Sequence, residues 1–179
     1  MKIHIIRHAD AIDRSSAISD DYLYRTCRGR TRFRRVAETL KKCDIDPDLI
    51  ITSPLVRAVQ TADILAETLR FSGEVTVHPP LAAGFGLARL RELLEQVAPA
   101  KEVVLVGHEP DLGHLTGELL DLSPCNLKKG GVVSLKLKPQ QEEYQAILLW
   151  LVSGGGKLLT DNERVRARLT DNSTVFREG

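Results

Sequence analysis

The sequence predicts an α/β protein, a three-layer sandwich in which a mostly parallel, mixed sheet lies between two layers of helices. Short apolar segments rich in β-branched residues alternate with longer segments of helical periodicity, which is typical of consecutive β-α-β units. The segment Val103–Val106 is apolar without interruption, as expected for a strand buried on both faces. Two late strand-like segments, joined only through Pro139 and a polar turn, indicate at least one strand of opposite direction.

Each element has a sequence signal of its own. The expected strands are Lys2–Arg7, Asp48–Thr52, Glu74–Val77, Glu102–Val106, Val132–Lys138 and Ala146–Val152. The expected helices are Thr31–Lys42, Leu55–Arg70, Leu87–Val97 and Asp111–Leu120. In the second helix, the apolar residues recur at steps of three and four, which gives one buried face. They are Ala58, Ala62, Leu65 and Leu69.

Length and composition are those of one globular domain. The chain has 179 residues, 42% of them hydrophobic, and its 25 basic and 24 acidic residues give a net charge of +1. This balance argues against intrinsic disorder and against a nucleic-acid-binding protein, whose domain is usually strongly basic. We expect the folded domain to span residues 1–153. Gly154, Gly155 and Gly156 then form a hinge to a charged tail over residues 154–179.

The cysteines and apolar segments predict a cytoplasmic protein with reduced thiols. Cys27, Cys43 and Cys125 are an odd number without a Cys-x-x-Cys pair, so neither a zinc knuckle nor a disulfide framework is indicated. The longest apolar run, Ala146–Val152, is too short to cross a bilayer, and the first residues contain no signal-peptide core. We expect no membrane partner, and a monomer or a weak oligomer.

Polar residues at three predicted strand ends are the main functional signal. Arg7-His8 ends the first strand, Arg57 lies just beyond the second, and His108-Glu109 ends the fourth. Parallel strands place these ends at one edge of the sheet, where α/β proteins bind ligands. Two arginines and two histidines repel one another there unless they share an anion. The planar guanidinium groups match the spacing of phosphate oxygens. Phosphate is therefore the favoured anion, and a carboxylate is the alternative.

The same residues predict a chemistry. Neighbouring cations keep the His8 imidazole neutral and therefore nucleophilic, provided that an acceptor, expected to be a backbone carbonyl, fixes its other ring nitrogen. Arg7, Arg57 and His108 would hold the phosphoryl oxygens. Other phosphate chemistries fail on spacing, since Cys-x5-Arg, a P-loop and His-Glu-x-x-His are all absent from the sequence. We therefore expect neither a metal nor a cofactor.

These motifs together resemble the histidine phosphatase superfamily, and within it the SixA-type phosphohistidine phosphatases. The resemblance rests on Arg7-His8, on the segment from Ser53 to Ala62 and on Gly107-His108-Glu109-Pro110, and it covers about residues 1–152. It implies a phosphoglycerate mutase-like fold and a metal-independent phosphatase. His8 would be the nucleophile, and Arg7, Arg57, His108 and Glu109 would bind phosphate. The superfamily usually has Arg-His-Gly, whereas this chain has Ala9. It also has Arg25 in place of a leucine, although Thr26 and Gly29 fit the pattern.

The absence of an acidic residue that would protonate the leaving group favours one class of substrate over another. Many superfamily members carry, after the third strand, a carboxylic acid that protonates the leaving oxygen, but Leu81–Gly86 contains none. An imidazole leaves without such help, because its conjugate acid has a pKa near ~6.5. A protein phosphohistidine is therefore the favoured substrate. Asp10, Glu109 or Asp111 could instead donate the proton to a leaving oxygen, so a small-molecule phosphomonoesterase is an alternative. Because Ala9 departs from the usual Arg-His-Gly, a non-catalytic module that binds phosphate is a further alternative.

A cluster of basic residues precedes and begins the first helix. Six arginines lie between Arg25 and Arg35, just after Tyr22 and Tyr24. The cluster is either a solvated helix start or a docking patch for an acidic phosphoprotein. Nucleic acid is disfavoured, because Phe33 alone interleaves with the arginines and the net charge is near zero.

Overall fold

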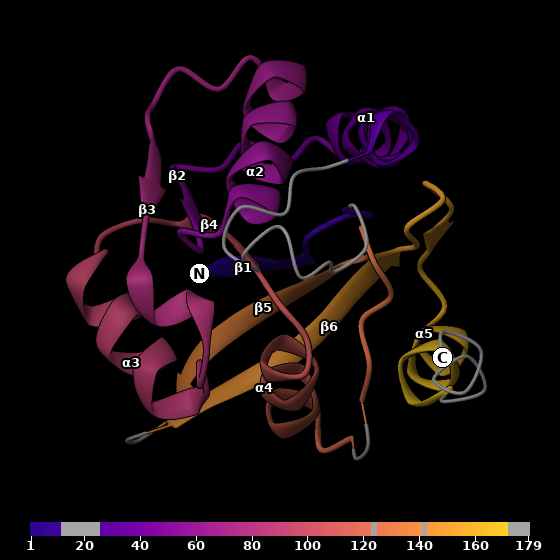
Figure 1. The fold of residues 1–179 in the computed structure, drawn as a ribbon. Helices are drawn as coiled ribbons and strands as arrows, with labels where there is room; N and C mark the ends of the chain where they lie inside the picture. Colours follow the sequence, from indigo (N-terminus) through magenta and orange to yellow (C-terminus); the bar gives the residue numbers. More distant parts are fainter. Residues whose placement is uncertain (12–25, 123–124, 141–142, 172–179) are drawn as a thin grey trace.

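The computed structural model describes residues 1–11, 26–122, 125–140 and 143–171 (Figure 1). Its strands are β1 (Lys2–Arg7), β2 (Leu49–Thr52), β3 (Val75–Val77), β4 (Glu102–Gly107), β5 (Val132–Gln140), β6 (Glu143–Val152) and β7 (Leu158–Leu159). Its helices are α1 (Cys27–Lys42), α2 (Val56–Leu69), α3 (Leu87–Gln96), α4 (Asp111–Leu120) and α5 (Asn162–Thr170), with a short 3-10 helix η2 at Pro79–Ala82.

The strands form one mixed sheet. Over the described residues its order is β3-β2-β4-β1-β5-β6-β7. The first four of these strands are parallel, while β5, β6 and β7 each run antiparallel to the preceding strand in the sheet. Helices α1 and α2 cover one face of the sheet, and α3, α4 and α5 cover the other (Figure 1). The predicted three-layer α/β fold is confirmed.

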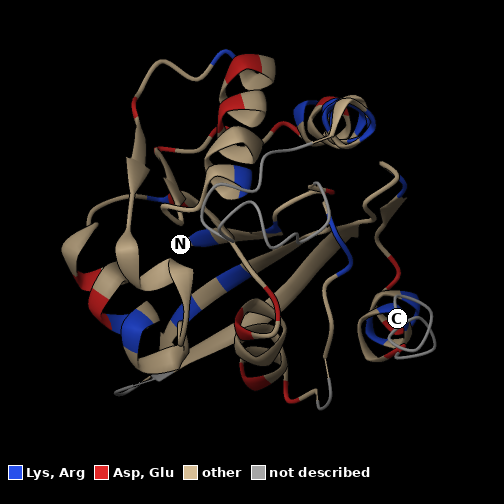
Figure 2. Ribbon diagram, in the orientation of Figure 1, with Lys and Arg blue, Asp and Glu red and all other residues tan. Residues whose placement is uncertain are grey.

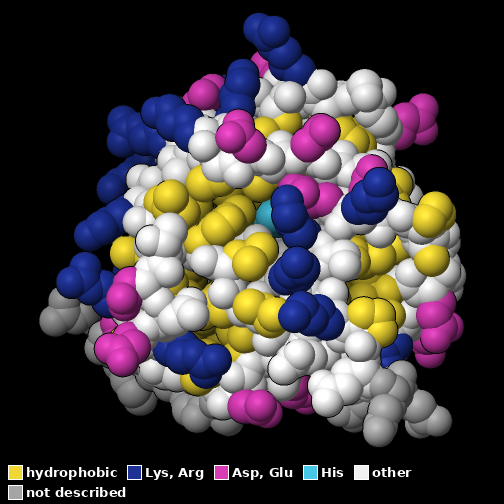
Figure 3. Space-filling view, turned by 180° about the vertical axis from the view of Figure 1, so that it is seen from behind, with side chains coloured by type: hydrophobic (Ala, Val, Ile, Leu, Met, Phe, Trp, Pro, Cys, Tyr) yellow, Lys and Arg dark blue, Asp and Glu magenta, His cyan; other side chains and the backbone are white. Residues whose placement is uncertain are grey.

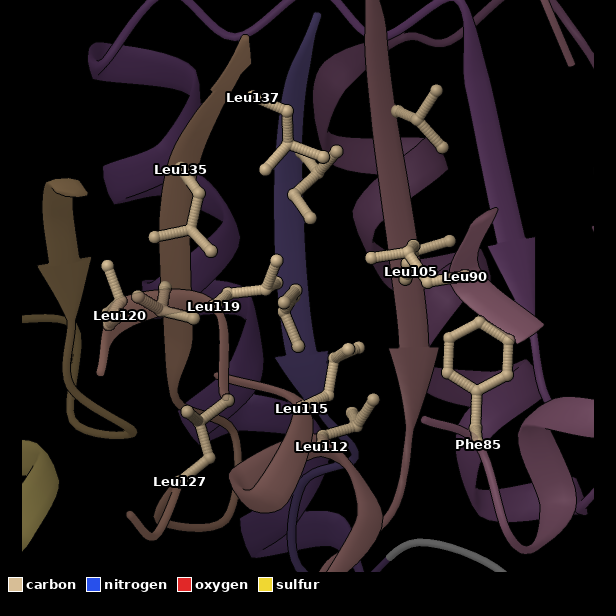
Figure 4. Packing of buried hydrophobic residues seen from close by; sticks show 14 of the residues in the cluster. Phe85, Leu90, Leu105, Leu112, Leu115, Leu119, Leu120, Leu127, Leu135 and Leu137 are labelled. Atoms are coloured by element: carbon tan, nitrogen blue, oxygen red, sulfur yellow. The ribbon is translucent and has the colours of Figure 1, made fainter. Parts of the chain in front are cut away.

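Two hydrophobic cores lie on the two faces of the sheet. On one face, Leu112, Leu115 and Leu119 of α4 point toward the leucines of β4 and β5 (Figure 4). On the other face, Phe33 of α1 and Leu65 of α2 are fully buried with the β2 and β4 side chains. Every residue of β4 is buried, so the prediction of a strand covered on both faces is confirmed.

Several element boundaries differ from the prediction, and the start of the first helix differs for a physical reason. Helix α1 begins at Cys27, four residues before the expected Thr31, because the Thr26 hydroxyl caps it by accepting a hydrogen bond from the Gly29 amide at 2.9 Å. The arginine-rich first turns carry no apolar periodicity that would have shown this. Between Ser134 and Leu135 the register of β5 against β6 shifts, because Leu149 of β6 has no partner on β5, as in a β-bulge.

The segment after Gly154 is more ordered than a charged tail. Lys157 is followed by β7, which pairs with β6, and then by α5. Val165 and Leu169 of α5 are 0% and 1% exposed and belong to the core on the α4 face. Two apolar residues one helical turn apart suffice to attach this otherwise charged helix to the sheet. The division of the chain at residue 154 stays a prediction.

Charged residues are distributed unevenly over the surface. Lys and Arg residues on α1, on the segment before β5 and on α5 lie on one side of the molecule (Figure 2). On the side opposite to the view of Figure 1, basic, acidic and hydrophobic side chains are interspersed (Figure 3). No helix among the described residues is long and apolar enough to cross a membrane.

Glu102, the first residue of β4, connects this strand to β1 and to the segment before β2 through hydrogen bonds. We expect it to contribute to the stability of the fold. Its carboxylate accepts hydrogen bonds from His4 Nε2 at 3.0 Å, from Lys2 Nζ at 2.9 Å and from the Asp46 amide at 3.0 Å. Glu102→Ala leaves the buried His4 ring without its acceptor and removes the partner of Lys2 and of the Asp46 amide, which should lower the free energy of unfolding by about 2–3 kcal/mol at pH 7. Urea denaturation measures this, and the exposed Glu95→Ala should change it by less than about 0.5 kcal/mol.

The loss of unfolding free energy in Glu102→Ala should depend on pH in a direction that the pKa of Glu102 predicts. The hydrogen bond from His4, followed by that from Lys2, lowers the pKa of Glu102 to about 2. A carboxyl group whose pKa is depressed in the folded state stabilises the protein fully above its unfolded pKa, and this stabilisation disappears as the pH falls through the folded value. The difference between wild type and Glu102→Ala should therefore narrow between about pH 4.5 and pH 2. A difference that is constant over this range contradicts the assignment.

Candidate active site

The ends of β1, β4 and β2 meet at one edge of the sheet. Arg7 pairs with Gly107 across β1 and β4, and Thr52 pairs with Val106 across β2 and β4. The His8 amide donates to the Gly107 carbonyl at 3.0 Å, and the Ser53 amide to the Val106 carbonyl at 2.9 Å. The residues that follow the three strands are thereby held side by side, as the sequence predicts.

His8 has a fixed orientation. Its Nδ1 donates a hydrogen bond to the carbonyl of Ala9 at 2.8 Å, which confirms the predicted backbone acceptor. This tautomer carries the proton on Nδ1 and leaves the Nε2 lone pair available for attack. The ring lies 5.0 Å from the His108 ring, centroid to centroid, with the planes tilted by 52°. The orientation of the ring is therefore compatible with the expected role of His8 as a nucleophile that attacks through Nε2.

The surroundings of His8 keep its imidazole neutral. Burial lowers its pKa to about 3, the Ala9 carbonyl acts in the opposite direction, and the charges of His108, Arg57 and Arg7 lower it further. All three of these residues therefore lie close enough to His8 to act on its charge. A neutral ring is the form that the expected nucleophilic role of His8 requires.

His108 is buried and fixed by a residue that the sequence analysis did not single out. It is 7% exposed, and its Nε2 lies 2.8 Å from the hydroxyl of Ser53, which is fully buried. The Ser53 hydroxyl also accepts from the Leu55 amide at 3.2 Å. Ser53 therefore links His108 to the start of α2. In the sequence, the only indication of this contact is the position of Ser53, which directly follows β2 as His108 directly follows β4.

Arg57 lies in the first turn of α2 and is only 7% exposed. Its backbone carbonyl accepts from the Thr61 hydroxyl at 2.6 Å, and the same hydroxyl is 3.4 Å from the amide of Ala9. The Ala9 side chain is buried in the core with Phe33. The methyl group that replaces the usual glycine is thus accommodated beside the α1 and α2 core.

The loop of residues 125–131 completes the site around Arg7, and sequence reasoning missed it. The Arg7 guanidinium donates through Nη1 to the Leu127 carbonyl at 2.8 Å, and the Arg7 amide donates to the Gly131 carbonyl at 3.2 Å. Gly130 donates to the Arg7 and His8 carbonyls and has a φ of +69°, which favours glycine. The glycine pair before β5 was the signal for a close approach of this loop.

Glu109 connects this loop to α4. Its Oε1 accepts from the Leu127 amide at 2.7 Å, and Leu127 in turn holds Arg7 through its carbonyl. Burial raises the pKa of Glu109 to about 7, although the Leu127 amide, the Arg7 charge and the Gly113 amide act against the increase. Glu109 thus lies close to Arg7 with a raised pKa, and it can donate a hydrogen bond to a phosphate oxygen only in its protonated form.

The other two candidate acids have structural contacts. Asp10 pairs with Arg32 at 3.3 Å. Asp111 accepts from the Gly84 amide at 2.5 Å and from the Phe85 amide at 3.2 Å, so it holds the loop that lacks an acid. That loop lies at the same edge of the sheet, because the His78 amide donates to the Thr52 carbonyl at 2.8 Å.

A groove of about 750 Å³ has Arg7 and Glu109 among its lining residues. Among the described residues, no cluster of three His, Cys, Asp or Glu side chains has an arrangement suited to a metal ion. Of the arginine cluster, Arg28 to Arg35 lie on α1. Arg25, Tyr22 and Tyr24 lie outside the described residues.

Comparison with known proteins identifies the class. A family model described as the histidine phosphatase superfamily (branch 1) matches residues 3–83, which include Arg7-His8 and Arg57. The chain belongs to this superfamily and is a phosphatase.

Its relatives include two curated bacterial proteins. It is 36% identical over 150 residues to an uncharacterised protein of Picosynechococcus sp., covering 76% of this chain and 85% of the relative. It is 29% identical over 123 residues to the phosphohistidine phosphatase SixA of Escherichia coli, covering 66% of this chain and 74% of SixA.

Solved structures share the fold. The protein histidine phosphatase SixA complexed with tungstate superposes with a TM-score of 0.76 at 24% identity, over 86% of this chain and 97% of that one. A mycobacterial glucosyl-3-phosphoglycerate phosphatase gives a TM-score of 0.62 at 21% identity, over 82% and 96%. The fold is thus phosphoglycerate mutase-like, and it is shared with small-molecule phosphatases.

The pKa values of the site predict a specific pH dependence. Because His8 is neutral above about pH 4, its ionisation should be absent from the kcat/KM profile between pH 5 and 9. Deprotonation of Glu109 near pH 7 brings a negative charge beside Arg7 and should weaken phosphoryl binding. The ratio of kcat/KM for wild type to that for Glu109→Gln should fall about three- to tenfold from pH 5.5 to 8.5. Taking the ratio removes the ionisation of the substrate.

Stability gives an independent check on Glu109. Its folded pKa of about 7 exceeds the ordinary value of 4.5, so the folded state binds more protons between these values. Wild type should lose stability as the pH rises from 4.5 to 7, and this loss should be absent in Glu109→Gln. Thermal unfolding at pH 8 should show the variant to be the more stable protein. Equal pH dependence of both proteins would mean that Glu109 titrates normally.

Proposed function

We propose that this protein is a metal-independent phosphohistidine phosphatase that acts on a phosphorylated protein through a phosphohistidine on His8. The observation that carries the proposal is the neutral His8 ring with Nε2 available, in a cationic pocket beside a loop without an acid. The similarity to the phosphohistidine phosphatase SixA of Escherichia coli supports it. The expected cytoplasmic location and the monomeric or weakly oligomeric state stay predictions.

In the first step, His8 Nε2 forms a bond to phosphorus as the bond from phosphorus to the substrate imidazole breaks. The electron pair of that bond stays on the substrate nitrogen. A proton on the other nitrogen of that ring makes the leaving group a neutral imidazole, which needs no further acid. The guanidinium groups of Arg7 and Arg57, with His108, would stabilise the phosphoryl oxygens during the transfer.

In the second step, water attacks the phosphorus of the phosphorylated His8. The bond to Nε2 breaks, inorganic phosphate leaves, and the neutral ring is restored with Nδ1 still bonded to the Ala9 carbonyl. Positive charge that a metal would otherwise supply comes from the two arginines. We therefore expect activity in the presence of EDTA.

The test compares a P–N with a P–O substrate. Wild type, with EDTA present, should hydrolyse phosphoramidate and a phosphohistidine-containing protein at least about 100-fold faster, in kcat/KM, than an alkyl phosphate, because an alkoxide leaves poorly without an acid. His8→Ala provides the background rate for each substrate. A faster reaction with the alkyl ester would show that the absence of an acid in Leu81–Gly86 does not determine the substrate.

The second candidate function is that of a small-molecule phosphomonoesterase. The observation that favours it is the raised pKa of Glu109. This carboxyl group has a pKa of about 7 and lies close to Arg7, so it is able to donate a proton to a leaving oxygen. In that case Glu109→Gln should abolish hydrolysis of the alkyl phosphate but spare phosphoramidate. A non-catalytic phosphate-binding module, the third candidate, would bind phosphate without forming an acid-labile label on His8.

A further inference from the structure

Most of the charged side chains that line the groove beside Arg7 are basic, and they come from separate parts of the chain. Arg32 comes from α1, Lys128 and Lys129 from the loop before β5, and Arg168 from α5. Figure 2 shows these three regions on the same side of the molecule. Together with Arg7 they make five basic residues among the described lining, against the two acidic residues Asp10 and Glu109.

The two arginines of the groove are able to take another anion in spite of their existing ion pairs, while Lys128 donates through Nζ to the Asp171 carbonyl at 3.3 Å. Arg32 is paired with Asp10 at 3.3 Å, and Arg168 with Asp171 at 3.6 Å, but both arginine side chains are 47% exposed. Exposed pairs of this kind contribute little, typically about 0.2–1 kcal/mol, since water competes for both partners. Glu109 adds less than a full negative charge at neutral pH, because its pKa is about 7.

The size and position of the groove indicate what it binds. At about 750 Å³ it is far larger than one phosphoryl group, and His8, Arg57 and His108 are not among its lining residues. Arg7, which directly precedes His8, does line the groove, so a ligand whose phosphate lies on His8 can extend past Arg7 into it. The cations belong to three different elements of the fold, which suits a ligand with several separate negative charges.

We propose that the groove binds an acidic segment of the phosphorylated partner protein, adjacent to the phosphohistidine that enters the pocket. This rests on the proposed function, and it assigns partner recognition to Arg32, Lys128, Lys129 and Arg168. Several weak, exposed ion pairs acting together change affinity by about tenfold at low ionic strength, and they accelerate encounter by attraction over distance. The effect is screened as salt rises above about 0.1 M.

The experiment uses two synthetic peptides with a central histidine phosphorylated by phosphoramidate. One carries glutamates at the flanking positions and the other carries glutamines there. For wild type in about 20 mM salt, kcat/KM should be about tenfold higher for the glutamate peptide, and this preference should vanish by about 0.5 M salt. In the triple variant Arg32→Gln, Lys129→Gln, Arg168→Gln, the preference should fall to less than about twofold.

A matched triple variant tests whether position matters or only net charge. Lys101→Gln, Lys136→Gln and Lys138→Gln remove three exposed cations outside the groove, and this protein should keep the wild-type preference. Equal loss in both variants, or no preference in wild type, overturns the docking role of the groove. If wild type hydrolyses neither peptide nor phosphoramidate, it is the proposed function that fails. The ratio of the two peptides is independent of the absolute rate, so a small change in folding of a variant does not imitate either result.

Discussion

His8→Ala should reduce turnover of phosphoramidate by at least about 10⁴-fold, which is the order of loss when a covalent nucleophile is removed. The reason is geometric. The Nδ1 hydrogen bond to the Ala9 carbonyl at 2.8 Å leaves Nε2 as the attacking atom, and the ring stays neutral because its pKa is about 3. The measurement is single-turnover release of phosphate, together with mass-spectrometric mapping of the phosphoryl group after a brief mix with substrate.

A second variant separates the chemical role of His8 from a structural one. His8→Asn places an amide donor where Nδ1 lies, so it keeps a hydrogen bond to the Ala9 carbonyl possible but has no nucleophilic nitrogen. It should be as inactive as His8→Ala while unfolding at a temperature close to that of wild type. Wild type should carry an acid-labile phosphoryl group on His8. Full activity in either variant, or a label on His108, would refute the mechanism.

The sequence predicted those parts of the site that follow strands. Each relevant strand is marked by a run of apolar residues, and the parallel pairing of β1, β4 and β2 brings the following residues together without further information. Arg7, His8 and His108 directly follow or end such runs. Their proximity could therefore be predicted from the parallel direction of the strands, without the order that the structure shows.

Long-range contacts made by irregular segments could not be predicted in this way. The Leu127 carbonyl that accepts from Arg7 belongs to a loop 120 residues away along the chain, and its position depends on the hairpin of β5 and β6. The carboxylate of Glu109 that holds this loop through the Leu127 amide is visible in the sequence only as a neighbour of His108. No period or spacing indicates a backbone partner at that distance.

The end of the chain shows the limit of composition as a guide. Helix α5 is rich in charge, so its sequence is typical of a solvated tail. Two residues, Val165 and Leu169, nevertheless bury it against the sheet. Burying two such side chains contributes about 3–6 kcal/mol before the entropy of ordering the helix is subtracted. Because of this attachment, Arg168 is held at the groove beside Arg7.

Arg57→Ala should lower kcat/KM for phosphoramidate by about 10³-fold or more, the loss expected when a guanidinium that stabilises a transferring phosphoryl group is removed. Arg57 is 7% exposed and lies in the first turn of α2, so its charge acts in a partly desolvated site, where it is worth more than at the surface. Arg34→Ala is the matched control. That arginine is 54% exposed, pairs with Glu67 at 3.6 Å, and should alter kcat/KM by less than about twofold.

Arg57→Lys tests whether the shape of the side chain matters as well as its charge. A lysine keeps the positive charge but loses the planar fork that binds two phosphoryl oxygens together. If Arg57 holds the group in transfer, lysine should recover at most about tenfold of the activity lost in the alanine variant, mainly in KM and not in kcat. Steady-state kinetics of the three proteins give the answer. If Arg57→Lys recovers full activity, Arg57 contributes only its positive charge. If Arg57→Ala loses less than tenfold in kcat/KM, the phosphoryl oxygens are held by Arg7 and His108 instead.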